Sequence, residues 1–204
     1  MSDANPKGFP DAEELVSEIF QNIGAEGQTL RNKVFEDCGF TGCNFGGATF
    51  TDCKFVDCTF TNCNLSNAKI GGTKFGSVEF VECKMLGIDW TRATWPRIAV
   101  GAPLRFRKCI LNDSSFFGLT LEEIVIDDCK AHGVDLREAN LSRGVLTGTD
   151  FRNAQFGKTN LMEADLTGAT NYSIDVFENR LEKAKFSRHE ALSLLDSLGI
   201  ELVD

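Results

Sequence analysis

Residues 35–70 read FEDCG FTGCN FGGAT FTDCK FVDCT FTNCN LSNAK I, with a large apolar residue at every fifth position. The spacing extends back to Leu30 and forward to Val100; after one extra residue it resumes at Phe106 and continues to Leu166. We call this the central position. Twelve of the 17 phenylalanines occupy it, where a random phase would place about one in five. All eight cysteines lie two residues before it: Cys38, Cys43, Cys53, Cys58, Cys63, Cys83, Cys109 and Cys129.

A period of five fits neither the 3.6 residues of a helical turn nor a long alternating strand. It indicates a chain that turns a corner every five residues, with the central residue and the residue two before it pointing inward. Four such sides close a coil of twenty residues, which predicts interior ladders of side chains. One would hold Phe40, Phe60, Phe80 and Val100, and another would hold Phe35, Phe55, Phe75 and Trp95.

The sequence therefore predicts an all-β solenoid of about seven coils over residues 28–170, with a register break near 101–105. Gly101 and Pro103 suit an outward bulge at that break. Residues 1–27 are expected to form an N-terminal segment with a capping helix. Residues 171–204 are expected to form a last partial coil and a C-terminal helix.

Composition excludes several classes of protein. A net charge of −9 argues against a surface that binds nucleic acid or anionic membrane as a whole. No stretch is long and apolar enough for a membrane span or an export signal, so we expect a cytoplasmic protein whose cysteines are reduced thiols. Disulfides, a metal site and a bound cofactor are not expected.

The two ends carry apolar stripes at helical spacing. Residues 11–23 are expected to form a helix with Asp11 and Glu14 as a capping box, serving as a lid on the first coil. Ser187 and Glu190 suggest a second capping box, before a helix that Gly199 ends. Its leucines either cap the coil or form a two-fold contact between copies, and we favour the contact. These leucines are Leu192, Leu194, Leu195 and Leu198.

Two charged surfaces are candidates for partner binding. Residues 90–112 contain no acidic residue, and this basic belt, which includes Arg97, Arg105 and Arg107, is either a solvated loop or a contact site. Stacked sides farther along display Asp127, Asp128 and Asp165, and the neighbouring side adds Glu122 and Glu123. Rows of carboxylates on a narrow rod can imitate a phosphate backbone, although such a face often serves only solubility.

Catalytic signals are missing from the sequence. It contains no phosphate-binding loop, no Gly-x-Ser-x-Gly, no His-Glu-x-x-His and no Cys-x-x-Cys. The two histidines, His132 and His189, are expected at the surface. A rod with a filled interior also offers no cleft that excludes water, so we expect a protein that is not an enzyme.

The five-residue units CNFGG, CTFTN, CNLSN, ANLSR and ADLTG resemble the repeat of the pentapeptide-repeat family. That resemblance implies a right-handed quadrilateral β-helix. It covers roughly residues 28–170 and by itself says little about function.

Four less regular stretches extend the resemblance: VECKMLGIDWTRATWP (81–96), CILNDSSFFGLTL (109–121), NYSID (171–175) and the C-terminal segment from Lys183. They are similar to the topoisomerase-protecting members of the family, namely the albicidin-resistance proteins of the AlbG type and the Qnr and MfpA types. This implies a DNA-mimicking homodimer, joined through its C-terminal ends, that binds DNA gyrase or topoisomerase IV and protects it from a poison without binding nucleic acid itself. A scaffold with another target is the alternative.

Overall fold

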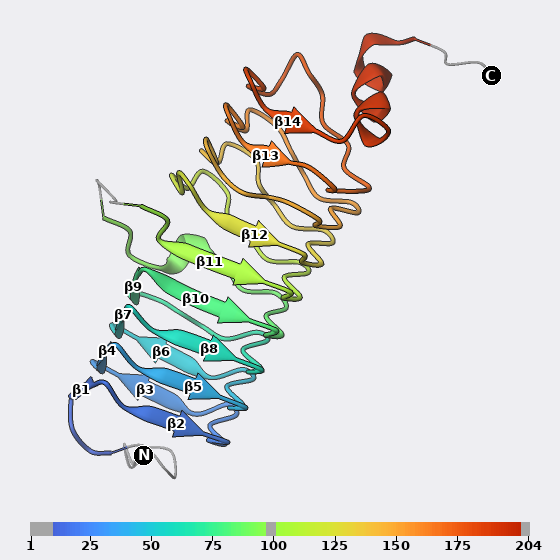
Figure 1. Ribbon diagram of the computed structural model, residues 1–204. Helices are drawn as coiled ribbons and strands as arrows, with labels where there is room; N and C mark the ends of the chain where they lie inside the picture. The colour runs from blue at the N-terminus through green and yellow to red at the C-terminus, as the bar shows by residue number, and fades with distance from the viewer. Residues whose placement is uncertain (1–9, 97–100, 201–204) are drawn as a thin grey trace.

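The computed structural model describes residues 10–96 and 101–200 and shows one continuous coil wound into a rod, with the C-terminal helix at the far end (Figure 1). Its elements are β1 (Glu14–Val16), β2 (Ile19–Gln21), β3 (Thr29–Arg31), β4 (Val34–Glu36), β5 (Gly39–Thr41), β6 (Thr49–Thr51), β7 (Lys54–Val56), β8 (Thr59–Thr61), β9 (Lys74–Gly76), β10 (Val78–Val81), η1 (Trp90–Arg92), β11 (Leu104–Arg107), β12 (Val125–Asp127), β13 (Asp165–Leu166), β14 (Lys185–Phe186) and η2 (Glu190–Leu198). The predicted solenoid is confirmed.

The rod has four walls of short parallel strands. The first wall contains β1, β4, β7 and β9, and the second contains β2, β5, β8, β10, β11 and β12 and continues to β13 and β14. The third wall consists of isolated bridges such as Asn44↔Asn64, and the fourth begins with β3 and β6. The second wall rises through eight steps of the coil from Phe20 to Phe186.

The corners explain the polar residues that follow the central positions. Asp37 and Asn62, each two residues after a central phenylalanine, both have φ of 53°. Asn, Asp and Gly tolerate this left-handed conformation better than other residues. Asn, Asp or Gly thus marks many of the corners in the sequence, while others carry residues such as Glu82 and Lys108, so the hydrophobic spacing is the more regular signal.

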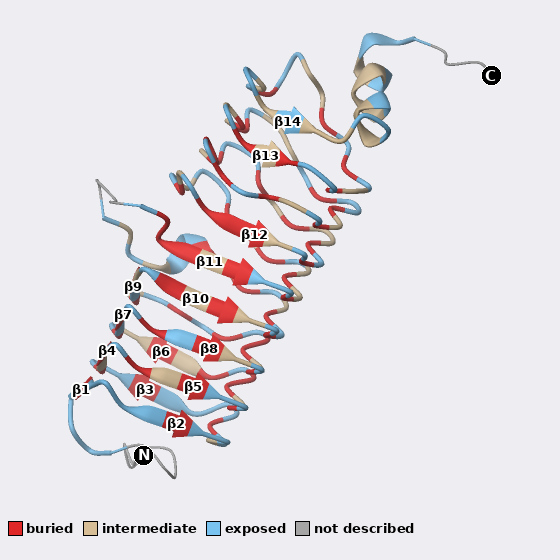
Figure 2. Ribbon diagram, viewed as in Figure 1, coloured by how far each residue is buried: buried red, intermediate tan, exposed pale blue. Residues whose placement is uncertain are grey.

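The interior is a stack of rings. The centroids of Phe40 and Phe60 are 4.4 Å apart with the rings 8° from parallel, and Phe60 and Phe80 continue the stack at 5.0 Å. The inward positions of each side are buried, while most flanking residues are half-buried or exposed (Figure 2). Each buried Phe or Leu contributes roughly 1.5–3 kcal/mol before chain entropy is subtracted.

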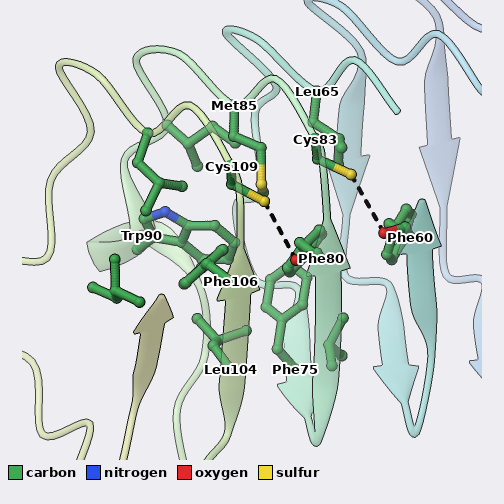
Figure 3. Close-up of a cluster of buried hydrophobic side chains, with 14 of the residues drawn as sticks. Phe60, Leu65, Phe75, Phe80, Cys83, Met85, Trp90, Leu104, Phe106 and Cys109 are labelled. Carbon is green, nitrogen blue, oxygen red and sulfur yellow. Dashed lines mark hydrogen bonds between the residues drawn. The ribbon is translucent and has the colours of Figure 1, made fainter. Parts of the chain in front are cut away.

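The cysteines line this interior and are all buried free thiols, as expected. Most donate a hydrogen bond to the carbonyl oxygen of a central residue in the previous coil. Cys83 Sγ lies 3.4 Å from Phe60 O, and Cys109 Sγ lies 3.3 Å from Phe80 O (Figure 3). The small side chain therefore fills space and also satisfies a polar group. Burial raises the pKa of Cys58 to about 12, so its thiol stays protonated at neutral pH.

The expected N-terminal helix over residues 11–23 is wrong. β1 and β2 occupy this segment, Leu15 and Phe20 are buried central residues, and the coil therefore begins before residue 28. Val16 and Ile19, which the helical stripe would have buried, are 58% and 71% exposed. The apolar stripe misled because Val16 and Ile19, which are also apolar, add the spacings of three and four residues that a helix requires to the repeat residues Leu15 and Phe20.

Lys33 closes the N-terminal end of the rod. Lys33 occupies an inward position, and its side chain is buried. One and two coils later, the same position holds Cys53 and Thr73. Lys33 Nζ donates to the carbonyl oxygens of Pro10, Asp11 and Ala12 at 3.0, 3.2 and 2.6 Å. The ammonium thus satisfies three main-chain oxygens of the segment that leads into β1.

The register break is larger than predicted. In the second wall Phe80 pairs with Phe106, so this coil has 26 residues. Phe106 therefore stacks on Phe80, where Val100 was predicted. Val100 itself lies outside the described residues. The first wall keeps its predicted ladder as far as Trp95, whose ring centroid lies 6.2 Å from that of Phe75. Among the described residues, the bridges of this wall stop at Thr94 and resume at Thr120, whereas the other three walls continue.

After residue 170 the coil continues, as predicted for the last partial coil, and its final rung is the pairing of β14 with β13. A helix follows, η2, and Gly199 ends it with φ of 66°, as predicted. The predicted capping box is wrong: Ser187 Oγ accepts a hydrogen bond from Gly168 N at 2.8 Å, and the residue at the cap is His189.

Candidate interaction surfaces

The predicted basic belt and the predicted acidic row lie next to each other on the second wall. Arg107 in β11 forms ion pairs with Glu79 and Asp127, each at 3.0 Å, and Asp127 also accepts a hydrogen bond from Thr147 Oγ1 at 2.5 Å. Arg105 stands two residues earlier on the same outer face, between Glu79 and Val125 in register. Arg97 lies outside the described residues. The two predicted surfaces are therefore partly one ion-pair network.

The other predicted carboxylates are also mostly compensated. Arg143 pairs with both Glu122 and Glu123. Asp165 lies 3.5 Å from Lys185 Nζ, and hydrogen bonding by Thr167, with a smaller effect of Lys185, lowers the pKa of Asp165. Asp128 is an exposed corner residue for which the structure shows no ion pair. The stacked sides that carry Asp127 and Asp165 contain no Lys or Arg of their own, and their positive partners, Arg107 and Lys185, come from the adjacent coils.

Carboxylates without ion pairs gather at the opposite end of the rod. In the part of the chain that the structure describes, every ion pair lies between residues 79 and 185. Five carboxylates around the corner between the first and second walls form none with a described residue: Glu14, Glu18, Glu36, Asp37 and Asp57. The assignment of residues 11–23 to a helix hid Glu14 and Glu18 from the sequence analysis, and without their coil the carboxylates at 36, 37 and 57 did not stand out as a set.

The C-terminal helix divides the four predicted contact leucines. Leu194 packs against the core, and Leu195 is half-buried. Leu192 and Leu198 are 46% and 44% exposed. Phe177 is 75% exposed and follows Val176, whose amide donates to Ser197 Oγ of the helix at 3.3 Å. One side of η2 thus caps the coil, and the other leaves apolar side chains in solvent.

The interior offers little space for chemistry. A void of only about 10 Å³ lies among the central rings of residues 50–90. His132 Nε2 is 2.8 Å from Asp150 Oδ2, and Asp150 also accepts a hydrogen bond from Asn171, but no serine or cysteine joins this pair in the described contacts. Within residues 10–96 and 101–200 no cluster of His, Cys, Asp and Glu is arranged to hold a metal ion. No helix of this described part is long and apolar enough to cross a bilayer.

Solved structures share this architecture. A trypsin-treated variant of QnrB1, a plasmid-mediated fluoroquinolone resistance protein, is similar with a TM-score of 0.70 and 22% identity, over 94% of this chain and 97% of that one. Full-length QnrB1 gives 0.62 and 20%, over 92% and 100%. At such identity the likeness establishes the fold alone. A comparison with curated proteins found no match.

Family models identify the repeat directly. The pentapeptide repeat region model matches residues 33–102, and the model of pentapeptide repeats in eight copies matches residues 132–168. Together the two matches span just over half of the chain and fall on both sides of the register break. The chain belongs to the pentapeptide-repeat family.

Proposed function

We propose that this protein is a non-catalytic interaction rod that binds DNA gyrase or topoisomerase IV and changes the response of the enzyme to a topoisomerase poison. The observation that carries the proposal is the match of nearly the whole rod, 94% of the chain, to a fluoroquinolone resistance protein. The filled interior supports it as well, because the outer walls are then the surface on which a large partner binds. The specific kinship with albicidin-resistance proteins stays a prediction.

DNA mimicry is the second part of the proposal, and the ion pairs refine it. A carboxylate held by an arginine presents less negative potential than a free one, and exposed pairs are further screened by salt. Asp128 and the unpaired set at Glu14, Glu18, Glu36, Asp37 and Asp57 therefore contribute more to a DNA-like potential than Asp127, Asp165, Glu122 or Glu123. Arg107 holds Glu79 and Asp127, Arg105 stands beside it on the same face, and both contact the partner only at the edge of the surface.

A homodimer is the third part. Leu192 and Leu198, with Phe177 nearby, form an apolar surface that suits a two-fold contact, while Leu194 remains inside its own rod. The full chain should sediment as a dimer, and Leu192→Asp with Leu198→Asp should give a folded monomer. A wild-type chain that is monomeric at micromolar concentration would contradict this part.

A scaffold with a different target remains the alternative, and the compensated charges on the second wall favour it. A rod whose predicted acidic row is largely neutralised is a weaker imitation of DNA than the sequence suggested. The two functions differ in whether a topoisomerase responds to the protein.

The deciding experiment is a supercoiling assay with purified gyrase, and a decatenation assay with topoisomerase IV, each with and without a fluoroquinolone. We expect the protein to bind, and either to restore activity in the presence of drug or to inhibit without it. Failure of binding, rescue and inhibition with both enzymes would remove the topoisomerase proposal. The variant Glu36→Gln with Asp37→Asn and Asp57→Asn should weaken binding more than Asp127→Asn with Asp165→Asn, and the reverse order would reject the refinement.

A further inference from the structure

An apolar groove lies on the first wall, just before the register break. Its volume is about 430 Å³, within the range of pockets that hold drug-sized ligands. Two rows of outward residues border it. Lys54, Lys74 and Thr94 form one row, and Val56, Gly76 and Pro96 form the other, with Phe75 and Trp95 between them.

The groove exists for two structural reasons. Gly76 occupies the position that Val56 holds one coil earlier, and because it has no side chain the outer row has a gap there. The gap is open: a Cβ added to Gly76 would have one neighbouring atom, Val56 Cγ2, at 3.9 Å. The wall also lacks a bridge between Thr94 and Thr120, so the next coil does not continue the surface over Trp95. Trp95 is half-buried and held by a hydrogen bond from its Nε1 to Trp90 O at 3.0 Å. The aromatic floor is therefore fixed in place.

Two like charges stand side by side at the border. Lys54 and Lys74 are register partners in β7 and β9, and both side chains are exposed. Like charges directly opposite each other in a sheet are destabilising. Neither lysine forms an ion pair with any residue that the structure describes, although the chain as a whole is acidic. The nearby carboxylates Asp52 and Asp57 stand at the adjacent corners and do not line the groove. An anion between the two ammonium groups would relieve this repulsion.

We propose that this groove is a binding site for a small aromatic anion, whose ring lies on Trp95 and Val56 and whose carboxylate, sulfonate or phosphate lies between Lys54 and Lys74. The size of the groove, its mostly apolar lining and its paired positive charges each fit that chemistry. The site uses none of the residues of the topoisomerase proposal: the carboxylate set and the helix η2 contribute nothing to the groove lining, although Glu36 is the register partner of Val56 on the same wall.

The test is a fluorescence titration of the full chain with two matched dyes. Anilinonaphthalene sulfonate carries an aromatic system and one negative charge, and phenylnaphthylamine is its uncharged counterpart. We expect one saturable sulfonate site per chain. Lys54→Gln with Lys74→Gln should weaken sulfonate binding about tenfold and change binding of the neutral dye less than twofold, whereas Gly76→Val should weaken both dyes by filling the notch.

The control variant is Lys84→Gln, an exposed lysine at the same position of a repeat on the third wall, and it should bind both dyes like the wild type. All substituted side chains point into solvent, and thermal melts verify folding. Sulfonate binding that is unchanged in the double lysine variant, or equally weakened by Lys84→Gln, overturns the proposal. It is also overturned in favour of a peptide site if a capped Glu-Phe-Glu peptide displaces the dye at lower concentration than naphthoate does.

Discussion

Replacing Lys33 with methionine should loosen the first coil of the rod and leave the coils behind it in place. Methionine keeps the apolar stem but removes the ammonium that holds the carbonyl oxygens of Pro10, Asp11 and Ala12. Hydrogen bonds to charged groups contribute roughly 1.5–3 kcal/mol each, but these oxygens belong to exposed residues, so water replaces part of what is lost. We expect a local loss of about 2–3 kcal/mol rather than the sum of three bonds.

Amide hydrogen exchange measures this loss where it occurs. The amides of Ser17 and Val34 donate across the first and second coils, to Glu36 O at 2.9 Å and to Glu13 O at 2.8 Å. Their exchange should accelerate about 30- to 150-fold, since each 1.4 kcal/mol is a factor of ten in the opening equilibrium. Neighbouring coils of a solenoid interact mainly pairwise, so the amide of Asn64, which bonds to Cys43 O, should change little.

The matched control is Lys69→Met, because Lys69 is exposed and pairs with no described carboxylate. It should change no protection factor by more than the equivalent of about 0.5 kcal/mol. The account of the N-terminal cap is refuted if Ser17 and Val34 exchange at wild-type rates in Lys33→Met, or if protection falls evenly along the whole rod.

Three further predictions concern the core and the surface. Phe60→Ala removes a ring stacked on both sides and should cost about 3–5 kcal/mol in urea unfolding; a loss below 1 kcal/mol would mean that the stack collapses around the gap. Thiol reagents should label the protein only on unfolding, because burial raises the pKa of Cys58 to about 12 from an unfolded value near 9. The contribution of this thiol to stability is therefore complete below pH 9 and is lost as the pH rises from 9 toward 12. Alkaline denaturation of Cys58→Ala, compared with the wild type, checks this. Arg107→Met should change thermal stability by less than about 1 kcal/mol, since its ion pairs are exposed, and a larger loss would show that the network supports β11.

The central positions and the cysteines could be read from the sequence because the repeat ties each side chain's direction to its place in the five-residue unit. Phe40, Phe60 and Phe80 stack as predicted, and the inward thiols are buried. The two ends were harder. Over residues 11–23 a helical stripe and the repeat share Leu15 and Phe20, and the left-handed corners at Ser17 and Asn22, with φ of 54° and 53°, show that the chain follows the repeat.

The charged surface was harder still, because ion pairs in a solenoid join residues about twenty apart. The predicted acidic side consists of residues between 124 and 168, and the basic residues that pair with its aspartates lie one coil before and one coil after that range. Arg107 is twenty residues before Asp127, and Lys185 is twenty after Asp165. Lys33 could not be identified as a cap, since nothing in the sequence says that an inward lysine would find three carbonyl oxygens.

The insertion shows why one wall of the rod differs from the other three. A coil of 26 residues can keep register on three walls if all the extra chain leaves at one place, and β10 with β11 shows that the second wall closes without a gap. The first wall then ends at Thr94 and begins again at Thr120, so the strand hydrogen bonds that a continuous wall would make are absent there among the described residues. The groove lies where this discontinuity meets the notch at Gly76, with Trp95 as its half-buried floor and Lys54 and Lys74 at its border. Next to the break, the pentapeptide coil thus gains a concave, apolar surface of the kind that a small ligand requires.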